Sequence, residues 1–365
     1  MREITVFCPT IGVGGVEKNL YLILNYLVKK KIKVNLLTCS LDKKKNFDKK
    51  IKIIGPSNNR FKESYQLTKI IICLICFLKT DLVKKKTILF SFQSNIFLIL
   101  FANLFKLKII SRINASPDVY LKSDLKRFFF NKIYKLSNLI IVNSNDLKKK
   151  VRKYINVNSK VIYNPSFNRN KSKLILKSRL TKKSNYVNLL NVGRLVHQKN
   201  QILLIKAIKY LKYKSKIKFK LNIVGNGNLY EFLSEKIKKD DLTSNIKIVR
   251  NITDPTNFYL KSDYFILSSL YEGLPNALIE AISYKKISLS SNCPTGPREI
   301  LLNGKAGYLY KNNDYKELAL TLLKAINNKI ESQKKLQLAY RSLSRFDEEK
   351  NCKKYLSVLS KFIYD

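Results

Sequence analysis

Short apolar segments alternate with amphipathic segments along almost the whole chain, and this alternation constrains the fold more than any other feature. The apolar segments are rich in β-branched and aromatic residues, which favours β-strands. Between most of them lie segments with helical spacing, such as 16–29, 61–78 and 146–154. Strands that are apolar throughout and alternate with helices indicate parallel sheets covered on both faces.

The alternation occurs in two series. The first series predicts strands at 4–10, 33–40, 50–55, 87–93, 108–114, 138–144 and 160–165, and the second at 186–192, 219–225, 245–251, 264–269 and 286–292. We therefore predict two doubly wound, Rossmann-like α/β domains, 1–165 and 186–345, which face each other across a central cleft. The polar, basic stretch 166–185 is predicted to be an interdomain linker. The segment 346–365 has helical spacing and can pack back on either domain, including the N-terminal one.

The chain is strongly basic, with 71 Lys and Arg against 25 Asp and Glu, a formal net charge of +46. Such a charge suggests a polyanionic partner, either nucleic acid or an anionic membrane. A general compositional bias competes with this explanation, because lysine is spread along the chain and His, Met and Trp are almost absent. We place the bias first and attraction to a membrane surface second, and both can hold.

The two longest apolar runs are expected to lie inside the fold. The run 70–78 is too short to span a bilayer. The run 88–105 contains Ser, Gln and Asn, so it is interpreted as a strand, a polar loop and a core helix, with a membrane span as the lesser alternative. The N-terminus lacks the layout of a secretory signal. Cys73 and Cys76 form a CxxC in an apolar helix, where buried packing is favoured over metal or redox work. These features favour a reducing cytoplasm.

Open parallel sheets bind ligands beyond the carboxyl ends of their strands, so the loops after each strand are the candidate sites. Glycines 12, 14 and 15 follow the first strand and precede a helix. They would let backbone N–H groups approach an anion, but a plain tight turn explains them equally well.

Two cations follow the first strand of the second series. Gly193 ends that strand, and Arg194 and Lys199 lie in the loop GRLVHQKNQ. Arg offers a bidentate fork and Lys a point charge, so the pair could clamp a diphosphate. Lys199 taken alone is equally compatible with a solvated surface lysine. Gly225 and Gly227 repeat the strand–glycine–helix layout. They either leave room for a base or a ribose, or simply form a tight turn.

The segment YEGLPNALIEA, 271–281, places two carboxylates around a turn. Glu272 lies in the loop and Glu280 in the following helix, where its apolar neighbours predict partial burial and therefore a partner. The turn is formed by Gly273, Leu274, Pro275 and Asn276, and its backbone N–H groups would favour a phosphate at the helix N-terminus. For Glu272 the alternative is a charge that merely suits the helix dipole. In the last loop, CPTGPREIL, Thr295 could touch a ligand or belong to a rigid connector.

Taken together, these motifs resemble the retaining, nucleotide-sugar-dependent glycosyltransferases of the GT-B fold, in the glycosyltransferase 4 group. The matching pieces are GGVE (14–17), VNS (142–144), VIYNP (161–165), NVGRL and QKN (191–200), IVGNG (223–227), YEGLPNALIEA (271–281) and CPTGPREIL (293–301). The resemblance covers nearly the whole chain and is more specific in the second domain than in the first.

The resemblance implies a role for each matched residue. Glu272 would contact the hydroxyls of the donor sugar and Glu280 the ribose, while Arg194 and Lys199 would hold the leaving diphosphate. The implied donor-binding positions also include Gly14, Gly15, Gly193, Gly225, Gly273, Leu274, Pro275, Asn276 and Thr295. Fixed cations and helix-end amides aimed at the phosphates stabilise the charge that develops there, with one such donor contributing about 3 kcal/mol. No metal or other cofactor is expected, which agrees with the absence of an Asp-x-Asp motif.

The chain departs from this family at the expected acceptor side. Many members carry a histidine in the first domain, whereas the corresponding loop here, SRINASPD, has none. Arg112 and Asn114 are the candidates to face the acceptor, and Gln93 in the loop SFQSN is another.

The last loop resembles that of bacterial enzymes that build lipopolysaccharide, capsule or lipid-linked oligosaccharides, some of which transfer N-acetylhexosamines. The resemblance therefore implies a UDP-sugar donor, a lipid-linked glycan acceptor, no nucleic acid, and peripheral attachment to the anionic inner face of the cytoplasmic membrane. Two rivals are kept. A GT-B sugar-nucleotide epimerase would need more acid/base residues, and His197 is the only histidine. A nucleic-acid-binding protein would follow from the charge alone.

Overall fold

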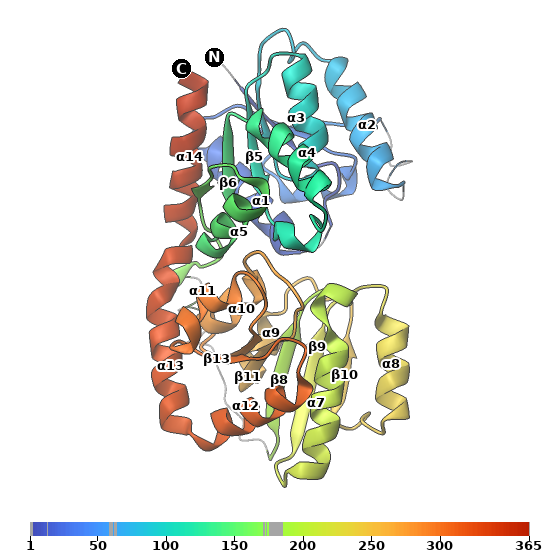
Figure 1. Ribbon diagram of the computed structural model, residues 1–365, viewed down its shortest axis with the longest axis vertical. Helices are drawn as coiled ribbons and strands as arrows, with labels where there is room; N and C mark the ends of the chain where they lie inside the picture. The colour runs from blue at the N-terminus through green and yellow to red at the C-terminus, as the bar shows by residue number, and fades with distance from the viewer. Residues whose placement is uncertain are drawn as a thin grey trace. The chain divides into compact units, whose positions relative to one another are not determined.

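The structure, a computed structural model, describes residues 3–12, 14–57, 61, 64–170, 172, 174 and 185–364. The chain forms two compact units, shown in Figure 1. Unit 1 comprises Met1–Pro165 together with Glu348–Asp365, and unit 2 comprises Ser166–Asp347. The polypeptide therefore passes between the units at two points in the sequence.

Unit 1 is built on a seven-stranded sheet whose neighbouring strands all run parallel, in the order β3-β2-β1-β4-β5-β6-β7. Each strand lies within one of the seven apolar segments of the first series. Their bounds are β1 Ile4–Phe7, β2 Val34–Leu37, β3 Lys52–Ile54, β4 Ile88–Ser91, β5 Ile109–Ile113, β6 Leu139–Val142 and β7 Lys160–Val161. β1, β2, β4 and β5 are buried along their whole length, as expected of strands with helices on both faces.

Helices cover both faces of this sheet. One face is covered by α1 (Gly15–Lys29) and α14 (Glu348–Tyr364), whose apolar side chains share one core with β1, β2 and β4. The other face is covered by α2 (Gln66–Leu78), α3 (Asn95–Leu104), α4 (Asp124–Lys135) and α5 (Asn145–Ile155), which share a second core. Among the described residues, no helix is both long enough and apolar enough to cross a membrane.

The C-terminal helix α14 completes the core of unit 1. Its inward side chains are Cys352, Tyr355, Val358, Leu359 and Ile363, all buried against α1 and the sheet. Arg112 on β5, only 1% exposed, donates from Nε to the Tyr355 hydroxyl at 2.9 Å and from Nη2 to Asn164 Oδ1 at 2.7 Å. Its guanidinium also lies over the Phe92 ring, 4.7 Å from the centroid.

The enclosure of Arg112 corrects the expected acceptor-facing role of this residue. A side chain on a central strand of a sheet covered on both faces points into a core. Here the core supplies partners for Nε and Nη2, whereas Nη1 is buried without a hydrogen-bond partner among the described residues. Arg112 therefore ties α14 to the sheet.

We expect Arg112→Met to destabilise the protein by about 3 kcal/mol, because the substitution leaves the buried Tyr355 and Asn164 groups without their charged donor. Urea unfolding followed by circular dichroism measures the loss. Arg152→Met, on an exposed arginine of α5, is the matched control and should stay within about 0.5 kcal/mol of the parent. Equal stability of the two variants would contradict this assignment.

Unit 2 has a six-stranded parallel sheet in the order β10-β9-β8-β11-β12-β13. The bounds are β8 Val187–Val192, β9 Phe219–Val224, β10 Ile246–Val249, β11 Tyr264–Leu267, β12 Ile287–Ser291 and β13 Tyr308–Tyr310. The first five lie in the predicted segments. The edge strand β13 was not predicted, because three residues, Tyr-Leu-Tyr, are too few to give a recognisable pattern.

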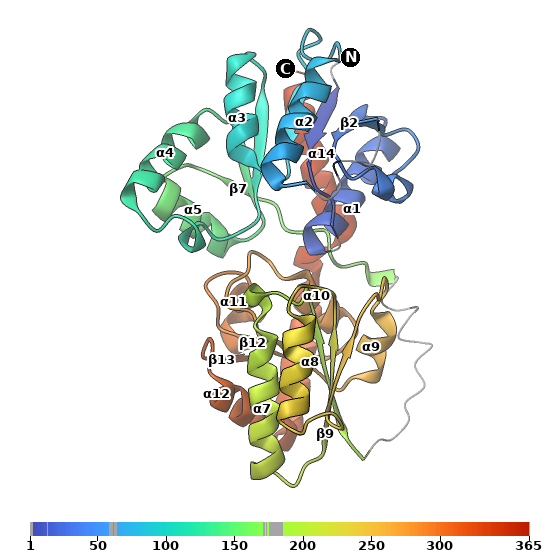
Figure 2. The ribbon, with the colours of Figure 1, turned by 90° about the vertical axis from the view of Figure 1, so that its right-hand side faces the viewer.

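The helices of unit 2 alternate with these strands. They are α7 Gln201–Lys214, α8 Tyr230–Lys239, α9 Thr256–Lys261, α10 Asn276–Ser283, α11 Pro297–Ile300, α12 Tyr315–Asn327 and α13 Lys329–Ser342, shown from the side in Figure 2. α7, α8 and α12 pack on one core with the sheet.

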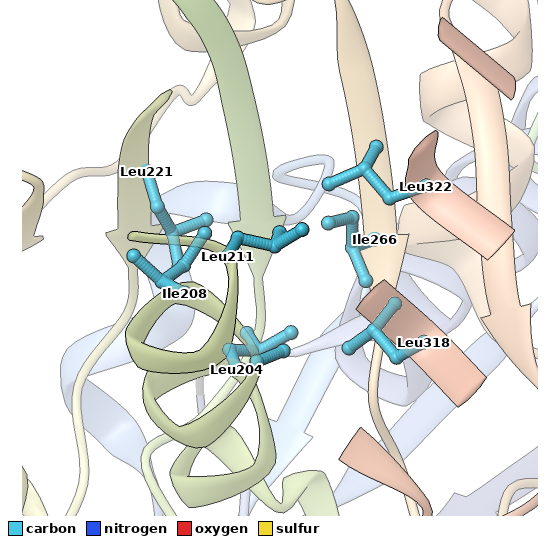
Figure 3. Close-up of a pocket in the computed structure, with 8 residues that line it drawn as sticks. Leu204, Ile208, Leu211, Leu221, Ile266, Leu318 and Leu322 are labelled. Atoms are coloured by element: carbon cyan, nitrogen blue, oxygen red, sulfur yellow. The ribbon is translucent and has the colours of Figure 1, made fainter. Parts of the chain in front are cut away.

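The core of unit 2 contains a void of about 10 Å³ between α7, α12 and the strands β9 and β11, drawn in Figure 3. Its lining is entirely apolar, consisting of Leu204, Ala207, Ile208, Leu211, Leu221, Ile266, Leu318 and Leu322. A void of this size without polar groups is a packing defect that stays dry, so it is no candidate for a ligand site.

The stretch predicted as a linker, 166–185, begins inside unit 2. Ser166 and Phe167 donate their backbone N–H groups to the Phe346 carbonyl at 3.1 and 3.0 Å, and Phe167 forms an isolated bridge with Asp347. Ser172 donates to the Ser283 carbonyl. Residues 171, 173 and 175–184 lie outside the described residues, so the linker prediction is not examined there.

Candidate active site

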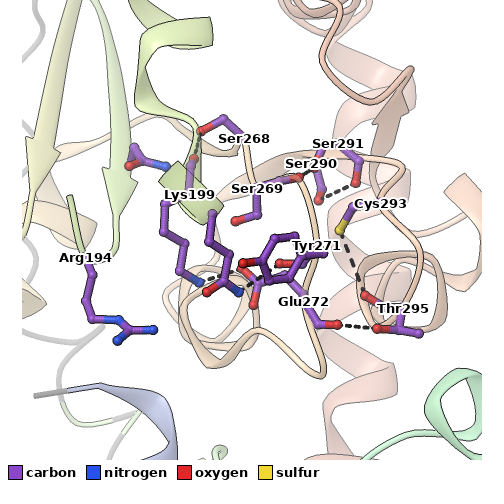
Figure 4. Close-up of polar contacts among 12 residues, drawn as sticks. Arg194, Lys199, Ser268, Ser269, Tyr271, Glu272, Ser290, Ser291, Cys293 and Thr295 are labelled. Carbon is purple, nitrogen blue, oxygen red and sulfur yellow. Dashed lines mark hydrogen bonds and ion pairs between the residues drawn. The ribbon is translucent and has the colours of Figure 1, made fainter. Parts of the chain in front are cut away.

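A buried ion pair lies at the carboxyl ends of the central strands of unit 2. Lys199 Nζ is 2.5 Å from Glu272 Oε1, and the two side chains are 17% and 7% exposed (Figure 4). Lys199 follows β8 and Glu272 follows the neighbouring β11, so strand adjacency brings together residues 73 positions apart. The second carboxylate oxygen, Glu272 Oε2, accepts no hydrogen bond from the residues that the structure describes.

The loop of Lys199 is fixed by backbone contacts with the loop of Glu272. Lys199 ends a single 3₁₀ turn, His197–Lys199, and Asn200 reverses the chain with a left-handed φ of 50° before α7 begins. Gln198 donates from Nε2 to the Tyr271 carbonyl at 2.9 Å, and its own carbonyl accepts from the Leu270 N–H at 2.9 Å. The loop that carries Lys199 and the loop that carries Glu272 are therefore fixed against each other, which keeps the ammonium and the carboxylate in one geometry.

The loop after β12 fixes Glu272 from the other side. The Thr295 hydroxyl donates to the backbone carbonyl of Glu272, and Gly296 adopts a φ of 89°. A Cβ on Gly296 would lie 2.5 Å from the Gly273 carbonyl oxygen, so only glycine allows this approach. Thr295, predicted to touch a ligand, thus holds the turn that carries Glu272. Burial, followed by the nearby Glu272 charge, raises the pKa of the Cys293 thiol to about 12, so Cys293 is a neutral packing residue.

The glycines in the loops after β8 and β9 allow close approach of neighbouring atoms. Gly193 lies against the Lys199 stem, since a Cβ there would be 3.6 Å from Lys199 Cγ and Cδ. A Cβ on Gly225 would lie 1.9 Å from the Gly193 carbonyl oxygen, and one on Gly227 would lie 2.1 Å from the Leu195 carbonyl oxygen. The IVGNG motif therefore lets two loops pack against each other, a role that the sequence did not suggest, and the expected contact of Gly225 with the donor stays a prediction.

Arg194 lies apart from the ion pair. Its side chain is exposed and makes no hydrogen bond or ion pair with the described residues, and Figure 4 shows its guanidinium separated from Lys199 and Glu272. Its backbone is nevertheless fixed, because Gln201 Nε2 donates to the Arg194 carbonyl at 2.9 Å. Of the two predicted cations, Lys199 is thus part of the ion pair, whereas Arg194 is exposed and available to a ligand.

Glu280 has the partner that its apolar neighbours required. It is half-buried on α10, and the Tyr259 hydroxyl from α9 donates to its Oε2 at 3.2 Å. Tyr259 is itself fully buried, and burial, followed by the Glu280 charge, raises the pKa of the Tyr259 hydroxyl well above its usual value. Tyr259 therefore stays a neutral donor. The sequence did not single it out, because one tyrosine of 21 carries no signal without its neighbour.

The turn before α10 has the predicted residues in place. Gly273, Leu274 and Pro275 are buried, and Pro275 is the residue directly before the helix rather than its first residue. Asn276 begins the helix, and its side-chain oxygen accepts from the Ser166 hydroxyl at 2.9 Å. The Asn276 side-chain oxygen is thus used within unit 2, and its contact with a phosphate through N–H groups stays a prediction.

The glycine loop of unit 1 lies at the start of α1. Gly14 is extended, with a φ of 176°, and Gly15 is the first helical residue, while Val13 lies outside the described residues. Glu17 in the first turn lies over this loop, with Oε2 2.9 Å from the position of a Cβ on Gly14. A carboxylate in the first turn suits the positive end of the helix dipole.

Gln93 and Asn114 lie on neighbouring loops of unit 1. Asn114 follows β5 and donates from Nδ2 to the Phe92 carbonyl at 2.8 Å, next to Gln93 in the loop after β4. The Asn114 Oδ1 atom is buried without a hydrogen-bond partner among the described residues. The structure therefore leaves the expected acceptor-facing role of Asn114 and Gln93 as a prediction.

Residues 172–343 match the family described as "Glycosyl transferases group 1". A segment of 147 residues is 33% identical to the capsular polysaccharide biosynthesis glycosyltransferase CapH of Staphylococcus aureus, covering 38% of this chain and 39% of that protein. A segment of 137 residues is 29% identical to a Campylobacter jejuni transferase, covering 38% of each chain. That protein is named GalNAc-α-(1→4)-GalNAc-α-(1→3)-diNAcBac-PP-undecaprenol α-1,4-N-acetyl-D-galactosaminyltransferase.

The whole chain is similar to solved structures. Anabaena HepE in complex with UDP-glucose has a TM-score of 0.77 at 16% identity, covering 99% of this chain and 100% of that one. The curated relatives match over a smaller part, since the matched segments cover 27% to 58% of their length.

Two parallel, doubly wound sheets define the fold of the chain, which is GT-B, as the sequence predicted. Residues 172–343 carry the glycosyltransferase group 1 domain, which supports the resemblance to the glycosyltransferase 4 group that the motifs indicated. The relatives named above belong to the synthesis of bacterial polysaccharides and lipid-linked glycans.

Proposed function

We propose that this protein transfers a sugar, an N-acetylhexosamine in the first instance, from a UDP-linked donor to a lipid-linked glycan, with retention of the anomeric configuration. The observation that carries the proposal is the buried Lys199–Glu272 pair, fixed by loops at the carboxyl ends of β8, β11 and β12. Parallel sheets bind ligands at that edge.

The pair suits the chemistry of a departing nucleoside diphosphate. Cleavage of the glycosidic bond leaves additional negative charge on the diphosphate and a cation-like sugar ring. Lys199 is a fixed ammonium, and Arg194 is an extended guanidinium five residues earlier, so both can approach phosphate oxygens. The Glu272 Oε2 atom is left to accept a hydroxyl of the donor sugar, while Oε1 positions Lys199.

Glu280 and Tyr259 would serve the nucleoside. A half-buried carboxylate whose Oε2 already accepts from a neutral tyrosine still has acceptor capacity for a ribose hydroxyl. Asn114 and Gln93 of unit 1 remain the proposed residues on the acceptor side. No side chain with a histidine's acid/base range is proposed, so the departing phosphate itself would deprotonate the acceptor hydroxyl.

Two relatives support the choice of substrates. The structural neighbour HepE is in complex with UDP-glucose, and the Campylobacter jejuni relative is named for an N-acetylgalactosaminyl transfer and a PP-undecaprenol-linked glycan. We therefore propose UDP-N-acetylhexosamines as donors and a diphospholipid-linked glycan as the acceptor, used at the inner face of the cytoplasmic membrane.

We propose that transfer needs no metal ion, since Lys199 and Arg194 supply the positive charge. Transfer should then proceed at an unchanged rate after dialysis against EDTA and in its continued presence. Loss of transfer on chelation, restored by Mg²⁺ or Mn²⁺, would contradict this part of the proposal.

The proposal is tested first by the effect of ligands on the Tm and then by turnover of sugar nucleotides. A nucleotide at a hundred times its Kd stabilises the native state by about 2.7 kcal/mol, which a thermal melt detects. We expect UDP to raise the Tm, RNA of the same phosphate concentration to leave it unchanged, and one UDP-sugar to be hydrolysed slowly to UDP. Stabilisation by RNA alone would favour the nucleic-acid-binding rival. Conversion of the sugar nucleotide to its epimer without release of UDP would favour the epimerase.

A further inference from the structure

Three consecutive helices of unit 1 expose apolar stripes on the same side of the sheet. α2 exposes Leu67, Ile71, Ile75 and Leu78, α3 exposes Phe97, Leu100 and Leu104, and α4 exposes Leu125, Phe128 and Phe129, each between 45% and 74%. The opposite sides of these helices fill the core against the sheet. Figures 1 and 2 show the three helices as neighbours within unit 1. Their exposed apolar stripes are named here together the α2–α4 face.

The packing within the layer keeps the helices together. Phe77 of α2 and Phe101 of α3 meet with ring centroids 5.7 Å apart. Asn95 of α3 donates to the Tyr134 hydroxyl of α4 at 3.1 Å. The α2–α4 face is therefore a preformed surface of a folded layer, and its exposed apolar side chains are not part of the core.

The clustering is specific to this layer. Thirteen of the nineteen most exposed large apolar side chains among the described residues lie between positions 65 and 136. In unit 2 they occur as separate residues, such as Tyr213 on α7, Phe232 on α8 and Leu320 on α12. α5, on the same side of the unit 1 sheet, exposes Lys148, Lys149 and Lys153 instead. Scattered exposed apolar residues are ordinary, whereas a contiguous set marks an interaction surface.

The charges around the apolar face select the partner. On α4, Leu125, Phe128, Phe129 and Lys132 share one side of the helix, since they are spaced by three and four residues, and Lys126 and Lys135 lie on its flanks. Lys132 Nζ lies 4.5 Å from the centre of the Phe128 ring, so the lysine stem runs along the aromatic surface. An apolar stripe bordered by lysines is the arrangement of helices that lie in an anionic bilayer interface.

A second copy of this chain is a poorer occupant. Each copy carries a formal net charge of +46, so face-to-face association would bring like charges together, whereas anionic lipid headgroups attract them. We infer that the α2–α4 face is the membrane-docking surface of the protein, with the aromatic side chains of α4 inserted below the headgroups of an anionic bilayer and the lysines at headgroup level. This inference deepens the proposed function, which puts the acceptor on a lipid, but it concerns binding alone.

The absence of tryptophan from the chain allows a direct test. Phe128→Trp and Phe232→Trp each introduce a single tryptophan at positions that are equally exposed, 53%, on unit 1 and unit 2. With vesicles of phosphatidylcholine and phosphatidylglycerol, the Phe128→Trp emission should shift to shorter wavelength and resist aqueous quenchers. The Phe232→Trp emission should stay unchanged. Equal shifts, or a shift at Phe232→Trp alone, would overturn the assignment of the face.

Charge variants separate docking from unspecific attraction. Lys126→Gln, Lys132→Gln and Lys135→Gln together should weaken sedimentation with these vesicles by roughly a hundredfold. Lys148→Gln, Lys149→Gln and Lys153→Gln remove the same charge from α5 and should weaken it by less than roughly tenfold. Equal losses in the two triple variants would mean that net charge, and not this face, governs binding, and would overturn the inference.

Two further outcomes have defined meanings. A blue shift of Phe128→Trp that grows with protein concentration in the absence of vesicles would assign the face to a second copy of the chain and overturn the inference. Membrane binding needs neither donor nor acceptor. A protein that docks through α4 but transfers no sugar would therefore contradict the proposed function without contradicting this inference.

Discussion

Lys199→Met and Glu272→Gln are each expected to lower the rate of sugar transfer by about a hundredfold to a thousandfold, the loss typical of one preorganised charge-stabilising group. Lys199 Nζ and Glu272 Oε1 are 2.5 Å apart in a nearly buried site, so each substitution also leaves its partner without a counter-charge. Kinetics at saturating donor, with the amount of folded enzyme fixed by circular dichroism, measure the effect.

The free energy of unfolding separates the structural role of this ion pair from its catalytic role. Removal of one member of a buried ion pair costs about 3 to 5 kcal/mol, whereas removal of both is close to neutral. The double variant Lys199→Met/Glu272→Gln should therefore regain most of the stability lost by the single variants while remaining inactive. Recovery of transfer in the double variant would mean that the pair only supports the fold.

A second ion pair of unit 2 provides the control. Lys209 on α7 lies 2.8 Å from Asp240, away from the strand ends that carry the candidate site. Lys209→Met removes a cation from a carboxylate that is itself 5% exposed, yet transfer by the folded enzyme should be unchanged. A comparable loss of transfer in Lys209→Met would contradict the assignment of the site to Lys199 and Glu272.

Gly296→Ala is expected to be the most damaging single methyl addition near the site. Gly296 has a φ of 89°, which L-residues adopt at a cost of about 1 to 2 kcal/mol. Its new Cβ would also lie 2.5 Å from the Gly273 carbonyl oxygen and 2.8 Å from Pro275 Cδ, which adds about 1 to 3 kcal/mol of overpacking. We expect a loss of about 3 kcal/mol in urea unfolding and a fall in kcat, because the displaced turn is the one that follows Glu272.

Gly304→Ala is the control for Gly296→Ala, because both glycines have a positive φ. Gly304 has a φ of 88°, but the nearest atom to its Cβ position is Leu309 Cδ1 at 4.0 Å. We expect a loss of about 1 kcal/mol and an unchanged kcat. If both glycine variants lose stability equally and neither loses activity, the contact between Gly296 and the Gly273 turn does not position the site.

Twelve strands and the two-unit α/β fold could be predicted from the sequence, because an apolar run flanked by helical spacing is a local signal. The pairing of Lys199 with Glu272 was not predicted as a contact, although both residues were chosen. Their meeting depends on β8 and β11 being neighbours, which no local pattern specifies. The partial burial of Glu280 was predicted correctly from its apolar neighbours, whereas its partner Tyr259 was not.

Arg112 marks the limit of such reasoning. Arg112 became a candidate to face the acceptor because its segment corresponds to the acceptor-side loop of the family, yet its hydroxyl partner Tyr355 is 243 residues away in the chain. The partner of this buried charge could not be recognised from the sequence, because Tyr355 belongs to the last helix. The same separation explains why the docking of α14 could be stated only as one of two alternatives.

The two crossings of the polypeptide between the units have a consequence for biosynthesis. Unit 1 is a discontinuous domain, since α14 supplies Tyr355 and four further core side chains and is translated only after the whole of unit 2. Domains usually fold in the order of their synthesis, but here the core between α1 and the sheet is completed only after the later half of the chain has emerged. We expect a stop codon after Asp347 to leave unit 2 folded and to destabilise unit 1.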